Sequence, residues 1–211
     1  MRTLRLAVLL IPAATAAFAQ QWKFGAVGGV GLFDNVSVTG TAGNATAGFA
    51  PGFVAGVFVE QNLFQHFSGQ IRYEYMQSDL RLSSGGQSAQ FSGAAHAVHY
   101  DAVFHTGSGE SRVQAFAALG LGLKDFVGNG TEAAYQPLSQ FGYFTKTSSW
   151  KPMGTVAAGV AFALNSNLSL RAEVRDYMTA FPTAVLTPAP GVKFGSFLNE
   201  VVPMISIVYQ K

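Results

Sequence analysis

The chain has 211 residues, of which 49% are hydrophobic and only 11% are charged, and it contains 24 glycines and no cysteine. High apolarity with few charges is the opposite of the composition of disordered proteins. The lack of cysteine excludes a disulfide framework and any Cys-ligated zinc or iron–sulfur site. The 13 basic residues include Arg2 and Arg5 of a segment predicted below to be removed, and without these two they equal the 11 acidic residues in number. No basic field then exists to recruit nucleic acid, so no nucleic-acid partner is expected.

Residues 1–19 have the pattern of a secretory signal peptide. Arg2 and Arg5 precede an apolar run, and Ala17-Phe18-Ala19 supplies the small-x-small sequence found before a cleavage site. A transmembrane anchor is the alternative, but the apolar run is shorter than the ~20 residues that a spanning helix needs. We predict cleavage after Ala19, so that residues 20–211 form the mature domain.

Alternation of apolar and polar residues recurs along the mature chain. Around Ile71 and Tyr73 it gives one apolar face and one charged face, and residues 168–175 repeat this pattern. Period two predicts strands, and each run has about the 9–11 residues of a tilted membrane strand or slightly more. The eight predicted strands lie near residues 22–34, 49–60, 67–78, 93–104, 112–124, 152–164, 168–178 and 200–210.

The connections between these strands alternate in length. Three are short (61–66, 105–111 and 165–167), and four are long and rich in Gly, Ser, Thr and Pro (35–48, 79–92, 125–151 and 179–199). Short turns at one end and long loops at the other are typical of outer-membrane barrels. The sequence therefore predicts an all-β fold, an eight-stranded antiparallel up-and-down transmembrane β-barrel with short periplasmic turns and long extracellular loops.

The signal peptide, the eight alternating segments and the sequences of residues 70–75 (QIRYEY) and 170–177 (LRAEVRDY) resemble a known family. They are similar to the small outer-membrane β-barrels typified by the OmpA transmembrane domain and OmpX, over the whole of residues 20–211. The resemblance implies a monomer in the bacterial outer membrane that contacts outer-membrane lipid. It also implies insertion by the barrel-assembly machinery, which in this family recognises an aromatic residue at the C-terminus. Here Tyr209 stands two places before the last residue.

In lipid only a closed sheet satisfies every backbone group, so the apolar face of each strand is expected to point outward. Aromatic residues near the strand ends are then expected at the lipid interface: Trp22, Phe24, Phe67, Tyr75, Phe104, Phe162 and Tyr209.

The charged face points into the lumen, which in an eight-stranded barrel is just wide enough for side chains to fill. Because the strands 67–78 and 168–178 lie opposite each other, their charges are expected to meet near mid-height. Buried charges pair, so we predict a neutral ion-pair network that plugs the lumen, with a proton or ion pathway or an acid/base pair as the alternative. Its predicted members are Arg72, Glu74, Asp101, Arg171, Glu173 and Arg175, and Lys23, Glu60, His99, Lys124 and Glu200 share the inward face.

No catalytic residue, metal site or cofactor is predicted. His96 shares a face with Ser92 near Asp125, as in some outer-membrane lipases, but the His-x-Ser spacing of those enzymes is absent. His96 and His99 point to opposite faces of a strand and cannot converge on a metal ion. The sequence therefore predicts a protein that is not an enzyme.

The third long loop is rich in aromatic residues. Exposed aromatics favour binding, so they are candidates to contact an extracellular ligand of unspecified chemistry; alternatively, the loop folds onto the barrel rim or extends the strands. The predicted function is a structural or surface-interaction role through the four long loops, with a narrow channel or small-solute porin as the alternative. A soluble ligand-binding barrel is disfavoured because it needs an apolar lumen. The candidate contact residues are Tyr135, Phe141, Tyr143, Phe144 and Trp150.

Overall fold

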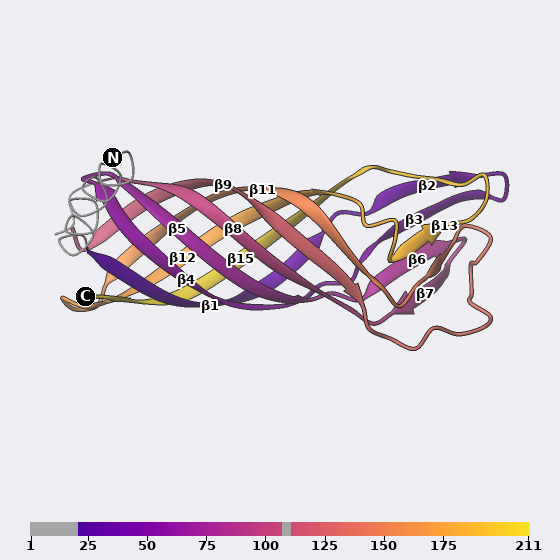
Figure 1. Ribbon diagram of the computed structural model, residues 1–211, viewed down its shortest axis with the longest axis horizontal. Coiled ribbons are helices and arrows are strands. Elements are labelled where there is room, and N and C mark those ends of the chain that lie inside the picture. Colours follow the sequence, from indigo (N-terminus) through magenta and orange to yellow (C-terminus); the bar gives the residue numbers. More distant parts are fainter. Residues whose placement is uncertain (1–20, 107–110) are drawn as a thin grey trace, which may run out of the picture.

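The computed structural model describes residues 21–106 and 111–211, so the expected signal peptide lies outside the described residues. Eight long strands form a closed antiparallel barrel in the order β1-β15-β12-β11-β9-β8-β5-β4 (Figure 1). The predicted eight-stranded barrel is thereby confirmed. Within the described residues no helix is long and apolar enough to cross a membrane. The barrel strands are β1 (Trp22–Phe33), β4 (Gly52–Phe64), β5 (Phe67–Gln77), β8 (Gly93–His105), β9 (Val113–Gly128), β11 (Ser148–Ala163), β12 (Leu168–Ala180) and β15 (Phe197–Gln210).

The long connections contain strands of their own, which the sequence reading treated as loops. They form a five-stranded sheet in the order β14-β2-β3-β6-β7 and a two-stranded sheet of β10 and β13. Both lie beyond the end of the barrel that is opposite the C-terminus (Figure 1). These strands are β2 (Val36–Gly40), β3 (Gly43–Phe49), β6 (Leu80–Ser84), β7 (Gln87–Phe91), β10 (Gly142–Phe144), β13 (Leu186–Pro188) and β14 (Lys193–Phe194).

Turn chemistry explains the hairpin of β6 and β7. Gly85 and Gly86 connect the two strands with φ of 56° and 80°. Two successive positive φ values are what a tight hairpin turn requires, and glycine adopts them without steric cost. The flanking strands bury alternate apolar side chains, among them Leu80 and Leu82. Two short apolar alternations joined by one glycine pair therefore fold as a hairpin rather than as an open loop.

At the end of the barrel that carries the small sheets, β9 and β11 extend furthest beyond the predicted strands. β9 continues past residue 124 to Gly128, and β11 begins at Ser148 rather than at residue 152. Their ladder reaches the pair Ser148↔Val127. The extra length carries the barrel wall out toward the two small sheets.

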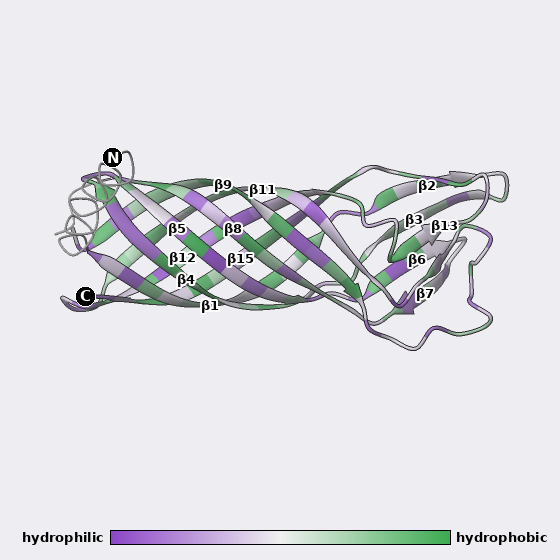
Figure 2. Cartoon of the chain, viewed as in Figure 1, coloured by the Kyte–Doolittle hydropathy of each residue, from purple (hydrophilic) through white to green (hydrophobic). Residues whose placement is uncertain are grey.

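The alternation of side chains along the barrel strands separates two environments (Figure 2). Arg72, Glu74 and Arg175 point inward and are fully buried, whereas Ile71 and Leu121 point outward and are 60% and 76% exposed. Figure 2 shows the resulting alternation of hydrophilic and hydrophobic residues along the wall. A wall with an apolar outside and a charged inside is the reverse of a water-soluble barrel.

Candidate functional site: the lumen and the extracellular sheets

An arginine–carboxylate pair crosses the middle of the lumen. Arg72 of β5 donates two hydrogen bonds to Glu173 of β12, at 2.7 and 3.0 Å, and β5 and β12 lie opposite each other in the barrel. Arg72 also contacts Glu74 at 3.2 Å. Two parallel bonds between a guanidinium and a carboxylate are stronger and more directional than one. The pair therefore ties the two opposite walls together.

Arg175 joins the same cluster from the next inward position of β12. It lies 3.2 Å from Glu173 and 2.8 Å from Asp101 of β8, and it donates to the Thr155 hydroxyl at 3.0 Å. Asp101 in turn contacts His99 at 2.9 Å. Three strands, β5, β8 and β12, thus contribute charges to one connected buried set, and β11 contributes the Thr155 hydroxyl.

A second cluster surrounds Glu60 of β4, nearer the short turns. Its carboxylate lies 3.1 Å from Lys23, 2.8 Å from Arg171 and 3.2 Å from His105, and Gln70 donates to it at 3.0 Å. Arg171, a predicted member of the lumen network, pairs with Glu60 here, and Gln70 links this cluster to the central one because it also accepts a hydrogen bond from Arg72 Nε at 3.2 Å. The sequence reading placed Glu60 on the inward face but did not include it in the network.

Toward the extracellular end, the carboxylates of Glu74 and Glu200 have close partners. Glu74 accepts a hydrogen bond from the Tyr177 hydroxyl, and Glu200 pairs with Lys124. The Lys124 ammonium also lies over the rings of Phe33, Phe126 and Tyr177, at 5.3, 5.1 and 5.4 Å from their centroids. These rings attract the cation electrostatically and form the boundary between the charged lumen and the apolar region above it.

Two phenylalanines inside the charged lumen were not anticipated. Phe58 lies between the guanidinium groups of Arg72 and Arg171, with centroid distances of 4.8 and 5.1 Å, and Phe116 lies 4.6 Å from Arg171. Glycines opposite in the ladders make room for the rings, because a Cβ at Gly25 would collide with Phe58. Each phenylalanine is separated by an even number of residues from an inward-facing charge of its own strand, Phe58 from Glu60 and Phe116 from Lys124. The period-two alternation could therefore have predicted that both rings point inward.

The predicted lipid-interface aromatics point outward at the turn end of the barrel. They are exposed or partly exposed on the outer wall: Trp22, Phe24, Phe67, Phe104, Phe162 and Tyr209. Tyr75 also faces outward but is higher on the wall and half-buried, packed against Phe53 and His96.

His96, the residue considered for catalysis, faces outward as well. Its Nδ1 lies 2.9 Å from the Tyr73 hydroxyl, and in the β8–β9 ladder it stands opposite Asp125. The hydrogen-bond partner of His96 is therefore a lipid-side tyrosine and not Ser92. This arrangement lacks the contact between a serine nucleophile and its base that acyl transfer requires.

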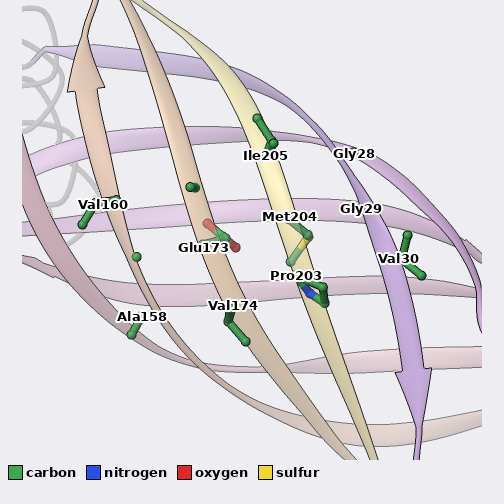
Figure 3. A pocket seen from close by; sticks show the side chains of 12 residues that line it. Gly28, Gly29, Val30, Ala158, Val160, Glu173, Val174, Pro203, Met204 and Ile205 are labelled. Atoms are coloured by element: carbon green, nitrogen blue, oxygen red, sulfur yellow. The ribbon is translucent and has the colours of Figure 1, made fainter.

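The outer wall has a shallow groove at the strands β11, β12, β15 and β1. It has a volume of about 530 Å³, and its floor is made of small residues such as Gly28, Ala158 and Ala172 (Figure 3). Glu173 reaches it from the lumen side but is held by Arg72 and Arg175. The groove therefore presents an apolar surface without a free charge.

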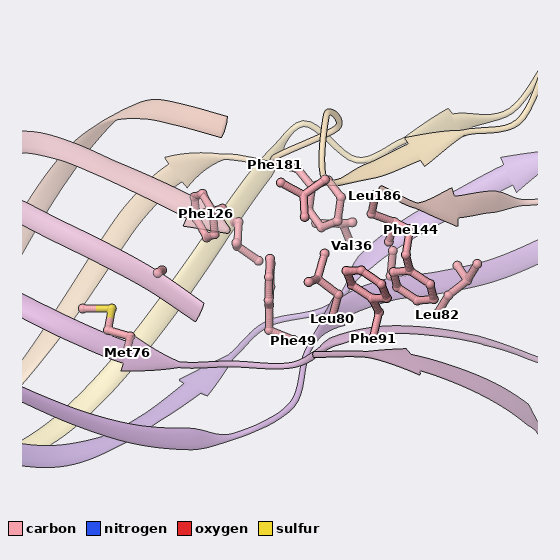
Figure 4. Packing of buried hydrophobic residues seen from close by; sticks show 14 of the residues in the cluster. Val36, Phe49, Met76, Leu80, Leu82, Phe91, Phe126, Phe144, Phe181 and Leu186 are labelled. Atoms are coloured by element: carbon pink, nitrogen blue, oxygen red, sulfur yellow. The ribbon is translucent and has the colours of Figure 1, made fainter. Parts of the chain in front are cut away.

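An apolar core fills the region between the barrel and the small sheets (Figure 4). Phe126 of β9 stacks on Phe49 at 5.4 Å, and Phe91 stacks on Phe144 at 5.3 Å with an interplanar angle of 6°. Around them lie buried aliphatic residues from further strands of the barrel and of both small sheets, among them Val36, Leu80 and Leu186. These packed side chains join the barrel to the small sheets.

The aromatic residues of the third long connection divide into two groups. Phe141 and Phe144 are 3% exposed and belong to the apolar core, so the structure does not place them on the contact surface where they were predicted. Burying them costs no hydrogen bond because phenylalanine has no polar group, and the two sheets supply a cover. Tyr135, Tyr143 and Trp150 remain accessible, with Tyr135 83% exposed.

The chain was compared with known proteins. Residues 4–198 match the family model described as outer membrane protein beta-barrel domain. Among solved structures, the chain is similar to outer membrane protein OprG from Pseudomonas aeruginosa, with 12% identity, a TM-score of 0.57 and coverage of 90% of this chain and 95% of that chain. It is also similar to Neisserial surface protein A, with 11% identity, a TM-score of 0.50 and coverage of 89% and 96%. No curated protein sequence matches the chain. At these identities the likeness to solved structures shows the fold, whereas the family model covers most of the sequence: the chain belongs to the outer-membrane β-barrel domain family, whose members are proteins of the bacterial outer membrane.

Proposed function

We propose that this outer-membrane barrel works through its extracellular surface and that its lumen is closed by ion pairs. The observation that carries the proposal is the construction of the extracellular part: two small sheets share an apolar core with the barrel mouth, so they form a rigid platform. Rigid elements display contact residues at a low entropic cost of binding. The role is non-enzymatic, in keeping with the contacts of His96.

The platform carries a recess suited to recognition. A cavity of about 250 Å³ lies between β7 and residues 131–137, with Phe91 and Phe144 among its lining residues and Tyr135 at its rim. An exposed tyrosine beside an apolar recess combines contact area with a hydrogen-bonding group, as binding hot spots do. We propose that Tyr135 contacts an extracellular partner at this recess, and that Tyr143, which faces solvent from β10 outside the recess, is a further contact residue.

Replacing Tyr135 by serine is expected to lower adhesion by about tenfold, because hot-spot tyrosines dominate binding energy. The measurement is the retention of cells that display the protein on an epithelial monolayer, relative to cells with an empty vector. Thr41→Ala, at the tip of the β2–β3 hairpin, is the matched surface control and should leave retention unchanged. Retention of the wild-type strain no higher than that of the empty-vector strain would contradict the proposed surface role, and equal retention of the wild-type and Tyr135→Ser strains above the vector would contradict the role of Tyr135.

Closure of the lumen has its own test. The ion pairs of the central and Glu60 clusters occupy the lumen, and the apolar core lies above them. We expect the purified protein to show no steady ion conductance in a planar bilayer. A large, steady conductance would favour the second candidate, a narrow channel. That candidate is supported by buried polar atoms that have no protein partner within the described residues, among them Glu200 Oε1 and Arg171 Nε, which leave room for water.

The orientation of the barrel gives a further prediction. An epitope inserted between Gly85 and Gly86, at the tip of an extracellular hairpin, should be labelled by antibody on intact cells. An epitope inserted at Ser166, in a short periplasmic turn, should be labelled only after the outer membrane is permeabilised. Labelling of the second epitope on intact cells would show that the orientation is reversed.

A further inference from the structure

The outer-wall groove contains an interruption in the strand ladder. Between β1 and β15 the paired positions run up to Gly29↔Met204 and resume at Leu32↔Val201. The missing pairs adjoin Pro203, which has no N–H to donate. On the other side of β15 the pair Val174↔Pro203 is present. At position 203 an N–H group would therefore point toward β1 and donate to the carbonyl of Val30. Because proline has no N–H, this carbonyl lacks that hydrogen bond.

This carbonyl lies at the middle of the membrane-facing wall. Pro203 stands midway along β15 between two exposed aromatic residues, Phe197 and Tyr209. Water is absent at that depth of a bilayer, so it cannot supply the missing donor. Among the described barrel ladders the other interruption is the register shift between Asn62 and Phe64, next to the short turn after β4. The Val30 carbonyl is therefore a hydrogen-bond acceptor at mid-height of the wall, within the hydrocarbon.

The groove around it has the shape and chemistry of a site for an alkyl chain. The small residues Gly28, Ala158 and Ala172 line it together with Pro203 and the branched side chains of Val30, Val160, Val174 and Ile205. In the β11–β12 ladder Ala158 is paired with Val174 and Ala172 with Val160, and Figure 3 shows Val30 of β1 on the other side of β15 from Val174. The only charged residue in the lining, Glu173, already has two arginine partners. The groove therefore favours apolar ligands over ions.

We propose that this groove binds an alkyl chain bearing one hydroxyl group, as in a long-chain alcohol or a protonated fatty acid. The hydroxyl donates to the Val30 carbonyl, and the chain lies against the glycine and alanine floor. An ordinary lipid acyl chain fills the same volume but offers no donor. The hydroxyl is therefore what distinguishes this ligand from bulk lipid.

The test uses the full-length mature protein, ¹³C-labelled, in nanodiscs of chain-deuterated phosphatidylcholine, titrated with 1-decanol or with decane. Decanol should shift the Ala172 methyl and the Val30 carbonyl resonances saturably. Decane should leave the Val30 carbonyl unchanged. Pro203→Ala restores the backbone donor and should weaken the apparent affinity for decanol by about 5- to 10-fold, the value of one net hydrogen bond.

Two leucine substitutions separate the groove from the rest of the wall. Ala172→Leu fills the groove and should abolish the saturable response, whereas Ala117→Leu, on the outward face of β9, should not change it. Heat-modifiable migration on a gel confirms that each variant has folded. Parallel, unsaturated shifts of the Ala117 and Ala172 methyls would overturn the proposal in favour of simple partition into the bilayer. An unchanged decanol response in Pro203→Ala would overturn the role of the Val30 carbonyl. Shifts that depend on protein concentration without any probe would assign the groove to a second copy of the chain.

Discussion

Glu173→Ala is expected to lower the free energy of unfolding by about 3–5 kcal/mol, the cost of breaking a buried ion pair by removing one partner. Glu173 is paired with Arg72 at 2.7 Å and with Arg175 at 3.2 Å, so its removal leaves two buried arginines short of a counter-charge. Arg175 keeps Asp101 and Arg72 keeps Glu74, which places the expected loss at the lower end of the range. The measurement is urea unfolding of the refolded protein in detergent micelles.

A double-mutant cycle makes this prediction specific to the pair. Replacing both Arg72 and Glu173 by methionine removes both charges together, and it should cost less than Glu173→Ala alone because Arg72 is no longer left without Glu173. Glu74 then keeps the hydrogen bond from Tyr177, and Arg175 keeps Asp101. Glu132→Ala removes an exposed carboxylate of the third long connection and is the matched control, with an expected effect within about 0.5 kcal/mol. Strictly additive effects of the Arg72 and Glu173 substitutions would show that the two residues do not stabilise the barrel as a pair.

Phe126→Ala should destabilise the protein by about 3–5 kcal/mol, the usual cost of emptying a buried phenylalanine site. Phe126 is 1% exposed, stacks on Phe49 and covers the Lys124 ammonium, so its loss opens a cavity and removes a cation–π contact. Because it joins the barrel to the small sheets, the backbone amides of β6 and β7 should also exchange faster with deuterium.

The control for this change is an exposed ring of similar size. Tyr135→Ala, at a position 83% exposed, should shift the free energy of unfolding by no more than about 0.5 kcal/mol. If Phe126→Ala proved as mild as Tyr135→Ala, the apolar core would not be what holds the small sheets on the barrel. Faster exchange confined to the barrel strands would lead to the same conclusion.

Sequence alone determined the eight barrel strands and the two faces of their wall. Period-two alternation in segments of membrane-spanning length, joined by short and long connections in turn, is compatible with few other folds. The inward position of Arg72, Glu74 and Arg175 followed from the same parity, because successive side chains of a strand point to opposite faces. These properties depend on local spacing, and local spacing is visible in the sequence.

Only the tertiary structure decided which inward residues meet. Arg72 reaches Glu173 across the lumen, whereas Arg171 pairs with Glu60 of β4, a residue 111 positions away in sequence. These choices depend on the stagger of the strands when the barrel closes, and stagger is a property of the whole sheet. The pattern of one strand carries no information about it.

Which apolar residues outside the barrel wall are buried was also decided only by the tertiary structure. Phe144 and Tyr143 are neighbours in the sequence, yet Phe144 is buried against Phe91 while Tyr143 faces solvent. The sequence shows that both are aromatic, but burial depends on a second layer that covers one face of the strand. That layer is assembled from connections far apart in the chain. Pro203 shows the same limit: the sequence shows that a donor is absent, and only the ladder shows that the carbonyl left without it belongs to Val30.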